Sequence, residues 1–475
     1  TTFCVALLLS FVRPLWAIYF IIIFDVFWLV RVVYLTFYVL VSYRRFAIAR
    51  RKPWRAMVAA LPQWRSITHL IVIPTYQESA DVLRETFTGL LRSDYPLDRC
   101  IVVLATEERD LPRATDVGAA IRKEFGSRFA SFLVTQHPAG IPDEIAGKGA
   151  NIAWAGRRAK ELIDRLGLRY DQIIVSTFDV DTCVTPNYFS ALTYAYLTHP
   201  TPTRTSYQPV PLFTNNIWDA PALARIAAHS TTFWMLTEQA RPERLFTFSS
   251  HSMSFQALVD VGFWQSDIVT EDSRIFLQCL LRYDGDYTVT PLPIAISMDA
   301  VRAKSIWRSL VNLYKQQRRW AYGVENFPFM AWHFARTKDI PRATKLHYMW
   351  NQLEGVYSWA TAPILIFVLG RLPLAIANYA ENTSALVQNA PFVLERLMLI
   401  AMVGLVPAAI LSTILLPVKR HPGRFIRLPL MVLQWLLFPI VMIVFGSIPA
   451  TDAQTRLMFG RYLNYWTTEK ARRSG

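Results

Sequence analysis

Residues 172–181 read Gln172-Ile173-Ile174-Val175-Ser176-Thr177-Phe178-Asp179-Val180-Asp181. This run is apolar, contains neither glycine nor proline, and ends in two carboxylates one residue apart. It predicts a buried parallel strand that carries acidic groups to its carboxyl end, where open α/β sheets bind ligands. The D-x-D spacing suits Mg²⁺ or Mn²⁺, which also hold substrate phosphates. For the tripeptide alone, a solvated strand end followed by a turn is the alternative.

The sequence around this run alternates between short apolar segments and amphipathic ones. Strands are expected at 70–74, 100–104 and 132–134, and helices near 79–93, 113–125 and 151–166. Alternating strands and helices indicate a parallel sheet with helices on both faces. Neither a G-x-G-x-x-G nor a P-loop sequence occurs, which argues against a dinucleotide site and a P-loop nucleotidase.

The composition indicates a membrane protein. Of 475 residues, 53% are hydrophobic and 13% aromatic, too many for an ordinary soluble enzyme. Residues 1–43 are almost continuously apolar and predict one long helix from Leu15 to Tyr43, preceded by a second helix or an interfacial segment. Arginines and a lysine crowd residues 44–55, which places that side in the cytoplasm.

The C-terminal third has further apolar segments. An amphipathic stretch, 326–346, is expected on the membrane surface, and apolar spans are expected at 347–370, 397–416 and 428–448. Residues 419–424 and the tail are both basic, as cytoplasmic segments are. Three full crossings cannot leave both on one side, so we expect the last span to be re-entrant.

The net charge of +15 does not indicate nucleic-acid binding. The lysines and arginines cluster beside apolar segments, where the positive-inside rule and anionic lipid headgroups account for them. Cys4, Cys100, Cys183 and Cys279 match no zinc or disulfide spacing. A bilayer is therefore the expected partner, and no structural metal is implied.

Five short motifs follow residue 66 in a fixed order. They are Ile73-Pro74-Thr75-Tyr76-Gln77-Glu78, Lys148-Gly149-Ala150-Asn151, Asp179-Val180-Asp181, Thr270-Glu271-Asp272 and Gln316-Gln317-Arg318-Arg319-Trp320. In this order they resemble the membrane-embedded branch of the family-2 glycosyltransferases, which includes cellulose, chitin and hyaluronan synthases. The resemblance covers residues 66–325. It implies an α/β fold of the GT-A (Rossmann-like) type flanked by transmembrane α-helices, a nucleotide-diphosphate sugar donor and Mg²⁺ or Mn²⁺.

Sugar transfer needs a stabilised diphosphate leaving group, a base and a pocket that aligns both partners. The resemblance assigns metal binding to Asp179 and Asp181, and makes Asp272, with Glu271 beside it, the base. For this triplet, local sequence alone favours a helix cap. Contacts to the nucleotide sugar are expected from Pro74, Thr75, Tyr76, Glu78, Glu107, Lys148 and Asp179. Without the resemblance, a solvated lysine in a loop is an equally good interpretation of Lys148.

The Q-x-x-R-W motif is expected to contact the acceptor and the diphosphate. Trp320 offers a flat face to a sugar ring, and Gln316 and Arg319 offer hydrogen-bond donors. A basic interfacial helix is the alternative. His251 is a further acceptor-contact candidate.

Two segments depart from the family pattern, and a third resembles it. The family often has acidic residues and a glycine after its second strand; here the run is Leu104-Ala105-Thr106-Glu107-Glu108, so we expect Glu107 to substitute. Phe248-Ser249-Ser250-His251-Ser252-Met253 stands where cellulose synthases have a glycine- and arginine-rich segment, which leaves the acceptor undefined. Tyr465-Trp466-Thr467-Thr468-Glu469-Lys470 resembles a gating loop, with Thr468 and Lys470 closing over nucleotide; a solvated basic tail is the alternative.

These expectations define a domain plan. It comprises membrane helices in 1–43, a basic linker at 44–65, a GT-A domain at 66–325, an interface helix at 326–346, membrane segments in 347–450 and a basic tail at 451–475. The expected activity is inverting transfer from a UDP-sugar to a growing polysaccharide, with possible export, at a bacterial inner membrane with the catalytic domain in the cytoplasm. Alternatives are a non-processive transferase for a lipid-linked acceptor, and a transporter or scaffold with an inactive domain.

Overall fold

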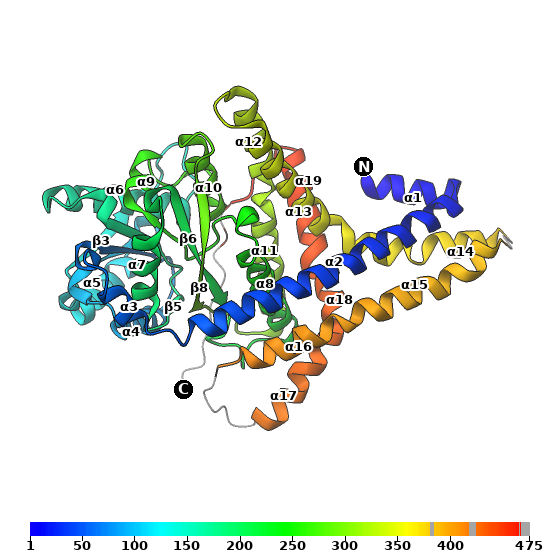
Figure 1. Cartoon of the computed structure of the whole chain (residues 1–475), viewed down its shortest axis with the longest axis horizontal. Helices are drawn as coiled ribbons and strands as arrows, with labels where there is room; N and C mark the ends of the chain where they lie inside the picture. The colour runs from blue at the N-terminus through cyan, green and yellow to red at the C-terminus, as the bar shows by residue number, and fades with distance from the viewer. Residues whose placement is uncertain (381–383, 418–423, 465, 467–475) are drawn as a thin grey trace.

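The computed structural model describes residues 1–380, 384–417, 424–464 and 466. An α/β domain built on one sheet forms one part of the molecule, and long helices project from it on the other side (Figure 1). In the projecting part, α2 (Pro14–Ala49) and α15 (Ala385–Val403) run alongside each other (Figure 1).

Eight strands form a mixed sheet in the order β3-β2-β1-β4-β7-β6-β8-β5. The strands are β1 (Thr68–Pro74), β2 (Cys100–Glu107), β3 (Ser131–His137), β4 (Ile173–Thr177), β5 (Cys183–Val184), β6 (Thr205–Leu212), β7 (Ser252–Ser254) and β8 (Thr288–Ser297). The first four in the sheet order are parallel. β7 is antiparallel to β4 and β6, and β5 is antiparallel to β8.

The expected all-parallel sheet is thus correct for one half only. β5 and β7 contain two and three residues, too few to show a hydrophobic period in the sequence. The strand predicted within residues 172–181 is confirmed as β4, which covers Ile173–Thr177. Phe178 and the D-x-D pair follow directly after it.

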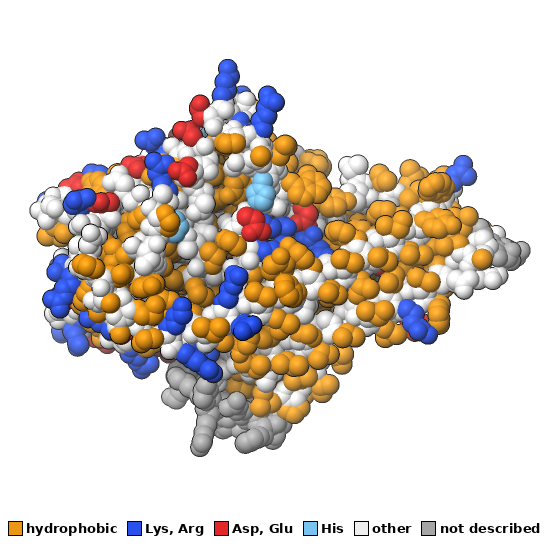
Figure 2. Space-filling view, viewed as in Figure 1, with side chains coloured by type: hydrophobic (Ala, Val, Ile, Leu, Met, Phe, Trp, Pro, Cys, Tyr) orange, Lys and Arg blue, Asp and Glu red, His pale blue; other side chains and the backbone are white. Residues whose placement is uncertain are grey.

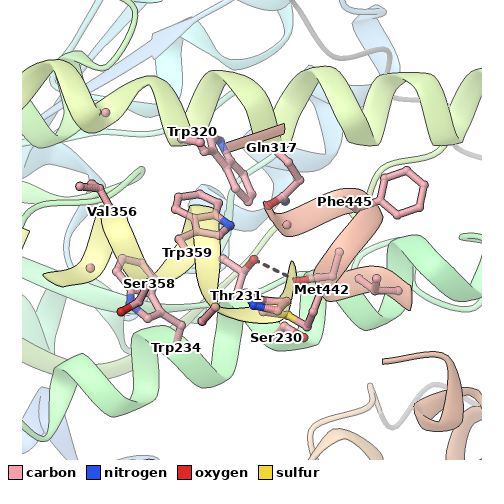
Figure 3. A pocket seen from close by; sticks show the side chains of 18 of the residues that line it. Ser230, Thr231, Trp234, Gln317, Trp320, Val356, Ser358, Trp359, Met442 and Phe445 are labelled. Atoms are coloured by element: carbon pink, nitrogen blue, oxygen red, sulfur yellow. Dashed lines mark hydrogen bonds between the residues drawn. The ribbon is translucent and has the colours of Figure 1, made fainter. Parts of the chain in front are cut away.

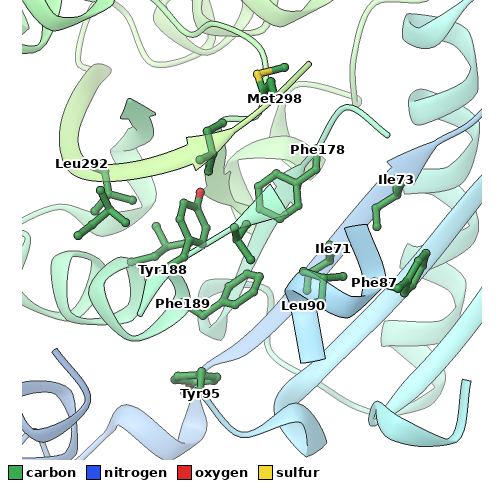
Figure 4. Packing of buried hydrophobic residues seen from close by; sticks show 14 of the residues in the cluster. Ile71, Ile73, Phe87, Leu90, Tyr95, Phe178, Tyr188, Phe189, Leu292 and Met298 are labelled. Carbon is green, nitrogen blue, oxygen red and sulfur yellow. The ribbon is translucent and has the colours of Figure 1, made fainter. Parts of the chain in front are cut away.

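Helices cover both faces of the sheet. They are α3 (Trp54–Ala59), α4 (Ala80–Leu91), α5 (Arg113–Phe125), α6 (Lys148–Arg165), α7 (Tyr188–Thr198), α8 (Ala222–Gln239), α9 (Phe255–Asp260), α10 (Glu271–Arg282), α11 (Ile306–Ala321) and α12 (Asn326–Arg336). Successive strand residues point to opposite faces. Ile71 and Ile73 therefore pack with Phe87 and Phe189 (Figure 4), whereas Leu70 packs into the core on the other face.

The projecting part is built from long apolar helices. They are α1 (Thr2–Val12), α2 (Pro14–Ala49), α13 (Arg342–Leu369), α14 (Leu372–Tyr379), α15 (Ala385–Val403), α16 (Leu405–Ile414), α17 (Arg424–Leu433), α18 (Phe438–Val441), a π-type segment at Met442–Ser447, and α19 (Ile448–Met458). Within the described residues, four helical stretches, 14–49, 342–379, 385–414 and 428–458, are long and apolar enough to cross a membrane. Hydrophobic side chains dominate the surface over α2, α15 and α16 (Figure 2).

Specific contacts join the helices to each other and to the α/β domain. Ile18 and Ile21 of α2 are fully buried against apolar residues of α13, α14 and α15. On the domain side, Arg318 of α11 forms an ion pair with Asp452 of α19 at 2.8 Å. α11, which carries the Q-x-x-R-W motif, is therefore held between the sheet domain and the apolar helices.

Candidate active site

The candidate site lies at the carboxyl ends of the parallel strands. Thr75 N–H donates to the Ala105 carbonyl at 2.9 Å, and Phe178 N–H donates to the Val72 carbonyl at 3.0 Å. These backbone bonds continue the sheet past its ladder and bring the segments after β1, β2 and β4 together. The D-x-D pair therefore reaches the sheet edge that the sequence predicted.

Lys148 joins two of the motifs directly. Its Nζ lies 2.8 Å from Asp179 Oδ1 and 2.7 and 2.9 Å from the two carboxylate oxygens of Asp272. Glu271 Oε1 lies 3.6 Å away. Lys148 is 7% exposed, so the alternative of a solvated loop lysine is wrong. This cation links the D-x-D strand to the start of α10.

The close approach of α6 to α10 depends on Gly149. A Cβ at this position would lie 3.1 Å from the Gln265 carbonyl oxygen and 3.3 Å from the Glu271 Cβ. A larger residue would push the two helix starts apart, and with them Lys148 and Asp272. Glycine next to this lysine therefore allows the two helix starts to approach closely.

Glu271 lies beneath this cluster and is fully buried. Burial, together with the neighbouring Asp272 charge, raises the pKa of Glu271 to about 7, while Lys148 and Arg319 oppose the shift. Neither Glu271 oxygen has a hydrogen-bond partner among the described residues. The carboxyl group is therefore protonated over much of the neutral range.

His251 packs beside Asp272 from the strand β7 side. Its Nδ1 lies 3.0 Å from the Phe248 carbonyl and 3.9 Å from Asp272 Oδ1. Burial lowers the pKa of His251, so the neutral ring donates from Nδ1 to the carbonyl. The side chain is 1% exposed and does not line the cavity described below. Its position is that of a packing neighbour of Asp272, and acceptor contact would require movement.

The loop after β1 is shaped by its own hydrogen bonds. Glu78 accepts from the Thr75 hydroxyl at 3.0 Å and from Tyr76 N–H at 2.6 Å. Gln77 has φ +66°, an unusual left-handed conformation for this residue type, and its N–H donates to Asp110. Pro74, Thr75, Tyr76 and Glu78 all line the cavity, so the motif is preshaped around an open space.

Glu107 ends β2 at the same edge. Its carboxylate pairs with Arg109, whose guanidinium carbon lies 3.9 Å from the centre of the Tyr76 ring. Glu107 is 3% exposed and also lines the cavity. The structure therefore places it next to the β1 loop, where the sequence expected a residue that contacts the donor.

The two aspartates of the D-x-D pair have different surroundings. Asp179 Oδ2 accepts from the Ser249 hydroxyl at 2.6 Å. Asp181 is 1% exposed, and its Oδ2 accepts from Asp299 N–H at 2.9 Å. Asp299 is itself buried and lines the cavity. The sequence analysis missed it, although it follows the apolar run of β8 as Asp179 follows β4.

The D-x-D oxygens fit a hard divalent cation in type. Among the described residues there is no cluster of three or more His, Cys, Asp or Glu side chains arranged to hold a metal. A cation here would thus depend on ligands from a bound diphosphate and water, which is how Mg²⁺ is usually held.

The first turn of α10 is clamped by the start of α12. Thr270 and Tyr462 both donate hydroxyl hydrogen bonds to Glu325. Arg274 Nε donates to Asn326 Oδ1 at 2.7 Å, and Asn326 Nδ2 donates to Ser273 at 2.9 Å. These bonds fix the backbone around Asp272, and no sequence motif pointed to Glu325.

Gln316, Arg319 and Trp320 line the cavity from α11. The Trp320 ring packs at 5.8 Å from Phe248 and 6.3 Å from Phe213, centre to centre. Figure 3 shows Trp320 near Trp359 of α13 and Gln317, with Trp234 and Ser230 of α8 on the opposite wall. The Q-x-x-R-W motif is therefore brought to the same space as the Lys148 cluster.

The cavity, here called the chamber, has a volume of about 1550 Å³. It extends from Asp179 and Asp272 past Trp320 into the apolar helices, where α2, α13, α15 and the 438–446 segment line it. Its walls are largely apolar on the helix side. Trp466 also lines it, with Lys315 Nζ 3.4 Å from the ring centre. Thr468 and Lys470 lie outside the described residues.

The chain is similar to known proteins in its sequence family and in its structure. The family model described as glycosyl transferase family group 2 matches residues 174–447. A search of curated protein sequences gives no match. Among solved structures, the chain is similar to the mannosyltransferase PcManGT from Pyrobaculum calidifontis in complex with GDP-Man and Mn²⁺. The sequence identity is 16%, the match covers 79% of this chain and 97% of that chain, and the TM-score is 0.43. It is also similar to S. aureus TarS 1-349 in complex with UDP-GlcNAc, with 11% identity, coverages of 83% and 93%, and a TM-score of 0.38.

The matched region covers more than half of the chain and includes β4, the D-x-D pair, α10 and the Q-x-x-R-W helix. The chain is a glycosyltransferase, with a GT-A domain accompanied by long apolar helices. It belongs to glycosyl transferase family group 2. The predicted fold class and enzyme class are thus confirmed, and the transporter or scaffold alternative is not supported.

Proposed function

We propose that this chain is a membrane-bound inverting glycosyltransferase that uses a nucleotide-diphosphate sugar, a UDP-sugar in the first instance. The observation that carries the proposal is the position of Lys148 between Asp179 and Asp272. It joins the strand end suited to a diphosphate with the carboxylate suited to an acceptor. Asp179 and Asp272 both line one chamber that is large enough for donor and acceptor together.

In the proposed reaction, an acceptor hydroxyl oxygen attacks the anomeric carbon of the donor sugar. The bond from that carbon to the diphosphate breaks, and the nucleoside diphosphate leaves with the electron pair. Asp272 accepts the hydroxyl proton. Attack and departure occur on opposite faces of the sugar, so the anomeric configuration inverts in one displacement.

The other residues at the site have supporting roles in this proposal. Lys148 moves its positive charge onto the diphosphate when the donor binds, and Arg319 adds a second cation from α11. Trp320 stacks on a sugar ring next to the transfer point. Asp179 and Asp181 would hold Mg²⁺ or Mn²⁺, which supplies further neutralisation of the leaving group.

The proposed acceptor is a growing polysaccharide whose far end extends into the chamber and is exported from there. The chamber supports this because it continues from Trp320 between α2 and α13 instead of ending at the catalytic residues. A lipid-linked acceptor is the second candidate, since side chains such as Ile366, Leu394 and Met398 line the helix end. The arginines at 44–55 support a cytoplasmic catalytic domain at a bacterial inner membrane.

The test is nucleotide release by the purified full chain from a panel of UDP- and GDP-sugars with Mn²⁺ or Mg²⁺, followed by sizing of the product. Asp272→Asn should lower turnover by about 10²–10⁴-fold, the range for loss of a general base. Asp267→Asn is the matched control, because this exposed aspartate lies five residues earlier. Long polymer supports the polysaccharide, and one added sugar on lipid supports the second candidate. Absence of metal-dependent turnover with every donor would contradict the proposal.

A further inference from the structure

Asp25 is an isolated acid in the apolar part of α2. It is the single acidic residue of Pro14–Ala49, and residues 15–24 and 26–30 on either side are uncharged and almost all apolar. The nearest charge along the helix is Arg31, about 9 Å away at 1.5 Å rise per residue. Arg31 pairs instead with Glu354, which also binds Arg244 at 2.9 Å.

The Asp25 side chain is buried without a partner. It is 6% exposed, its Oδ1 has no hydrogen bond, and no ion pair reaches it within the described part of the chain. A carboxyl group in such a setting is costly, and acids in membrane helices usually face a cavity or substrate path.

The position of Asp25 on α2 shows what it faces. Ile21 and Ile18, one and two turns earlier on the same helix face, are fully buried against α13, α14 and α15. Asp25 continues that face and is one of the residues that line the chamber, as is Trp28 one turn further on. The acid therefore points inward to the chamber and not to lipid.

Trp28 supplies the complementary hydrogen-bonding group. Its indole Nε1–H is buried and has no acceptor among the described residues. An acceptor at Asp25 and a donor at Trp28 are thus about 4.5 Å apart along the helix axis, by the same rise per residue. Most side chains lining the chamber are apolar, and the Arg31 guanidinium lies 5.2 Å from the centre of the Trp28 ring; binding sites of this kind use a few polar groups to fix the orientation of a ligand.

We propose that Asp25 and Trp28 form a second sugar-binding position inside the chamber, which holds a hydroxyl-bearing unit of the acceptor chain after it has passed Trp320. Neighbouring sugar hydroxyls both donate and accept, and so satisfy the carboxyl group and the indole together. A hydrocarbon chain would leave both unsatisfied. This inference rests on the proposed function, and it selects the polysaccharide over the lipid-linked acceptor.

The experiment measures product length and product retention on the purified full chain, with whichever UDP- or GDP-sugar supports turnover. Asp25→Leu should shorten the mean product and make retained product dissociate about tenfold faster, as expected for loss of a hydrogen bond to a charged or buried group. Asp25→Asn keeps a hydrogen-bonding side chain and should stay within about threefold of wild type. Trp28→Phe keeps the ring, loses only the N–H, and should fall between them.

Phe27→Leu is the control, since Phe27 is 51% exposed on the outer face of the same helix. Thermal melting of every variant separates a folding defect from a binding defect. If Asp25→Leu makes product of wild-type length, with or without a change in melting temperature, this inference is overturned and the proposed function stands. A lipid carrying one sugar, made equally by wild type and Asp25→Leu, overturns it in favour of a hydrocarbon occupant. Absence of turnover by wild type overturns the proposed function as well.

Discussion

Replacing Glu271 by glutamine should remove the part of the pH dependence of the unfolding free energy that comes from titration of this carboxyl group. The folded state raises the pKa of Glu271 from its usual 4.5 to about 7, chiefly by burial. Between these values the folded protein binds more protons at this site than the unfolded chain does. The stability contributed by the protonated carboxyl is therefore fully present below pH 4.5 and is lost as the pH rises through about 7.

The size of the effect follows from that interval. One pKa unit corresponds to about 1.4 kcal/mol, so the loss across the interval is about 3 kcal/mol. Glu271 is fully buried, so solvent screening does not reduce it. At about 2 °C per kcal/mol for a domain of this size, the melting temperature of wild type should fall by about 6 °C relative to Glu271→Gln between pH 5 and pH 8.

The assay is tryptophan-fluorescence melting of the purified protein in detergent at several pH values. The difference between variant and wild type is the informative quantity, because an amide at this position carries a pH-independent cost of its own. Glu124→Gln is the matched control, since the Glu124 side chain is 45% exposed in a surface pair with Arg84, and surface pairs contribute little. A difference that is constant from pH 5 to 8, or that has the opposite sign, would refute the reasoning.

Three further results are expected. Lys148→Met should lower kcat/KM for the nucleotide sugar by about 10²–10³-fold, because the cation that faces the diphosphate is lost. Lys148→Arg should recover part of this loss. Initial rates of nucleotide release measure the effect, and a change below threefold would contradict the assigned role. Glu325→Gln should lower kcat by about tenfold with little change in donor KM, since the Thr270 hydroxyl loses its charged acceptor next to Asp272. Steady-state rates are divided by the folded fraction from the melting curve, and a kcat per folded molecule equal to that of wild type would contradict this role. Removal of divalent metal with EDTA should abolish turnover, and full activity in EDTA would exclude a catalytic divalent cation. Asp181→Asn should raise the Mn²⁺ concentration that restores turnover, which an Mn²⁺ titration measures.

The strands and motifs were predictable where the sequence pattern is local. β1, β2 and β4 are continuous apolar runs, and acids or a proline-threonine pair end them at one sheet edge. The order of the five motifs was enough to indicate the glycosyltransferase family, which the family model then showed. The long apolar helices follow from length and composition alone.

Other features depend on contacts between residues far apart in the chain. The Lys148–Asp272 contact spans 124 positions and the Tyr462–Glu325 contact 137, and no periodicity in the sequence records such pairs. The short strands β5 and β7 exist because β8, β4 and β6 offer them hydrogen-bonding edges.

The amino-acid sequence was enough to predict the sheet edge, the acids on it and the apolar helices, because burial and strand or helix period act over a few neighbouring residues. Tertiary structure alone decided that Lys148 bridges two motifs, that Glu271 is buried enough for its pKa to rise, and that Asp25 faces a chamber continuous with the catalytic residues. Charge pairing, desolvation and cavity shape depend on distances in space, and these are set only when the α/β domain and the apolar helices pack together.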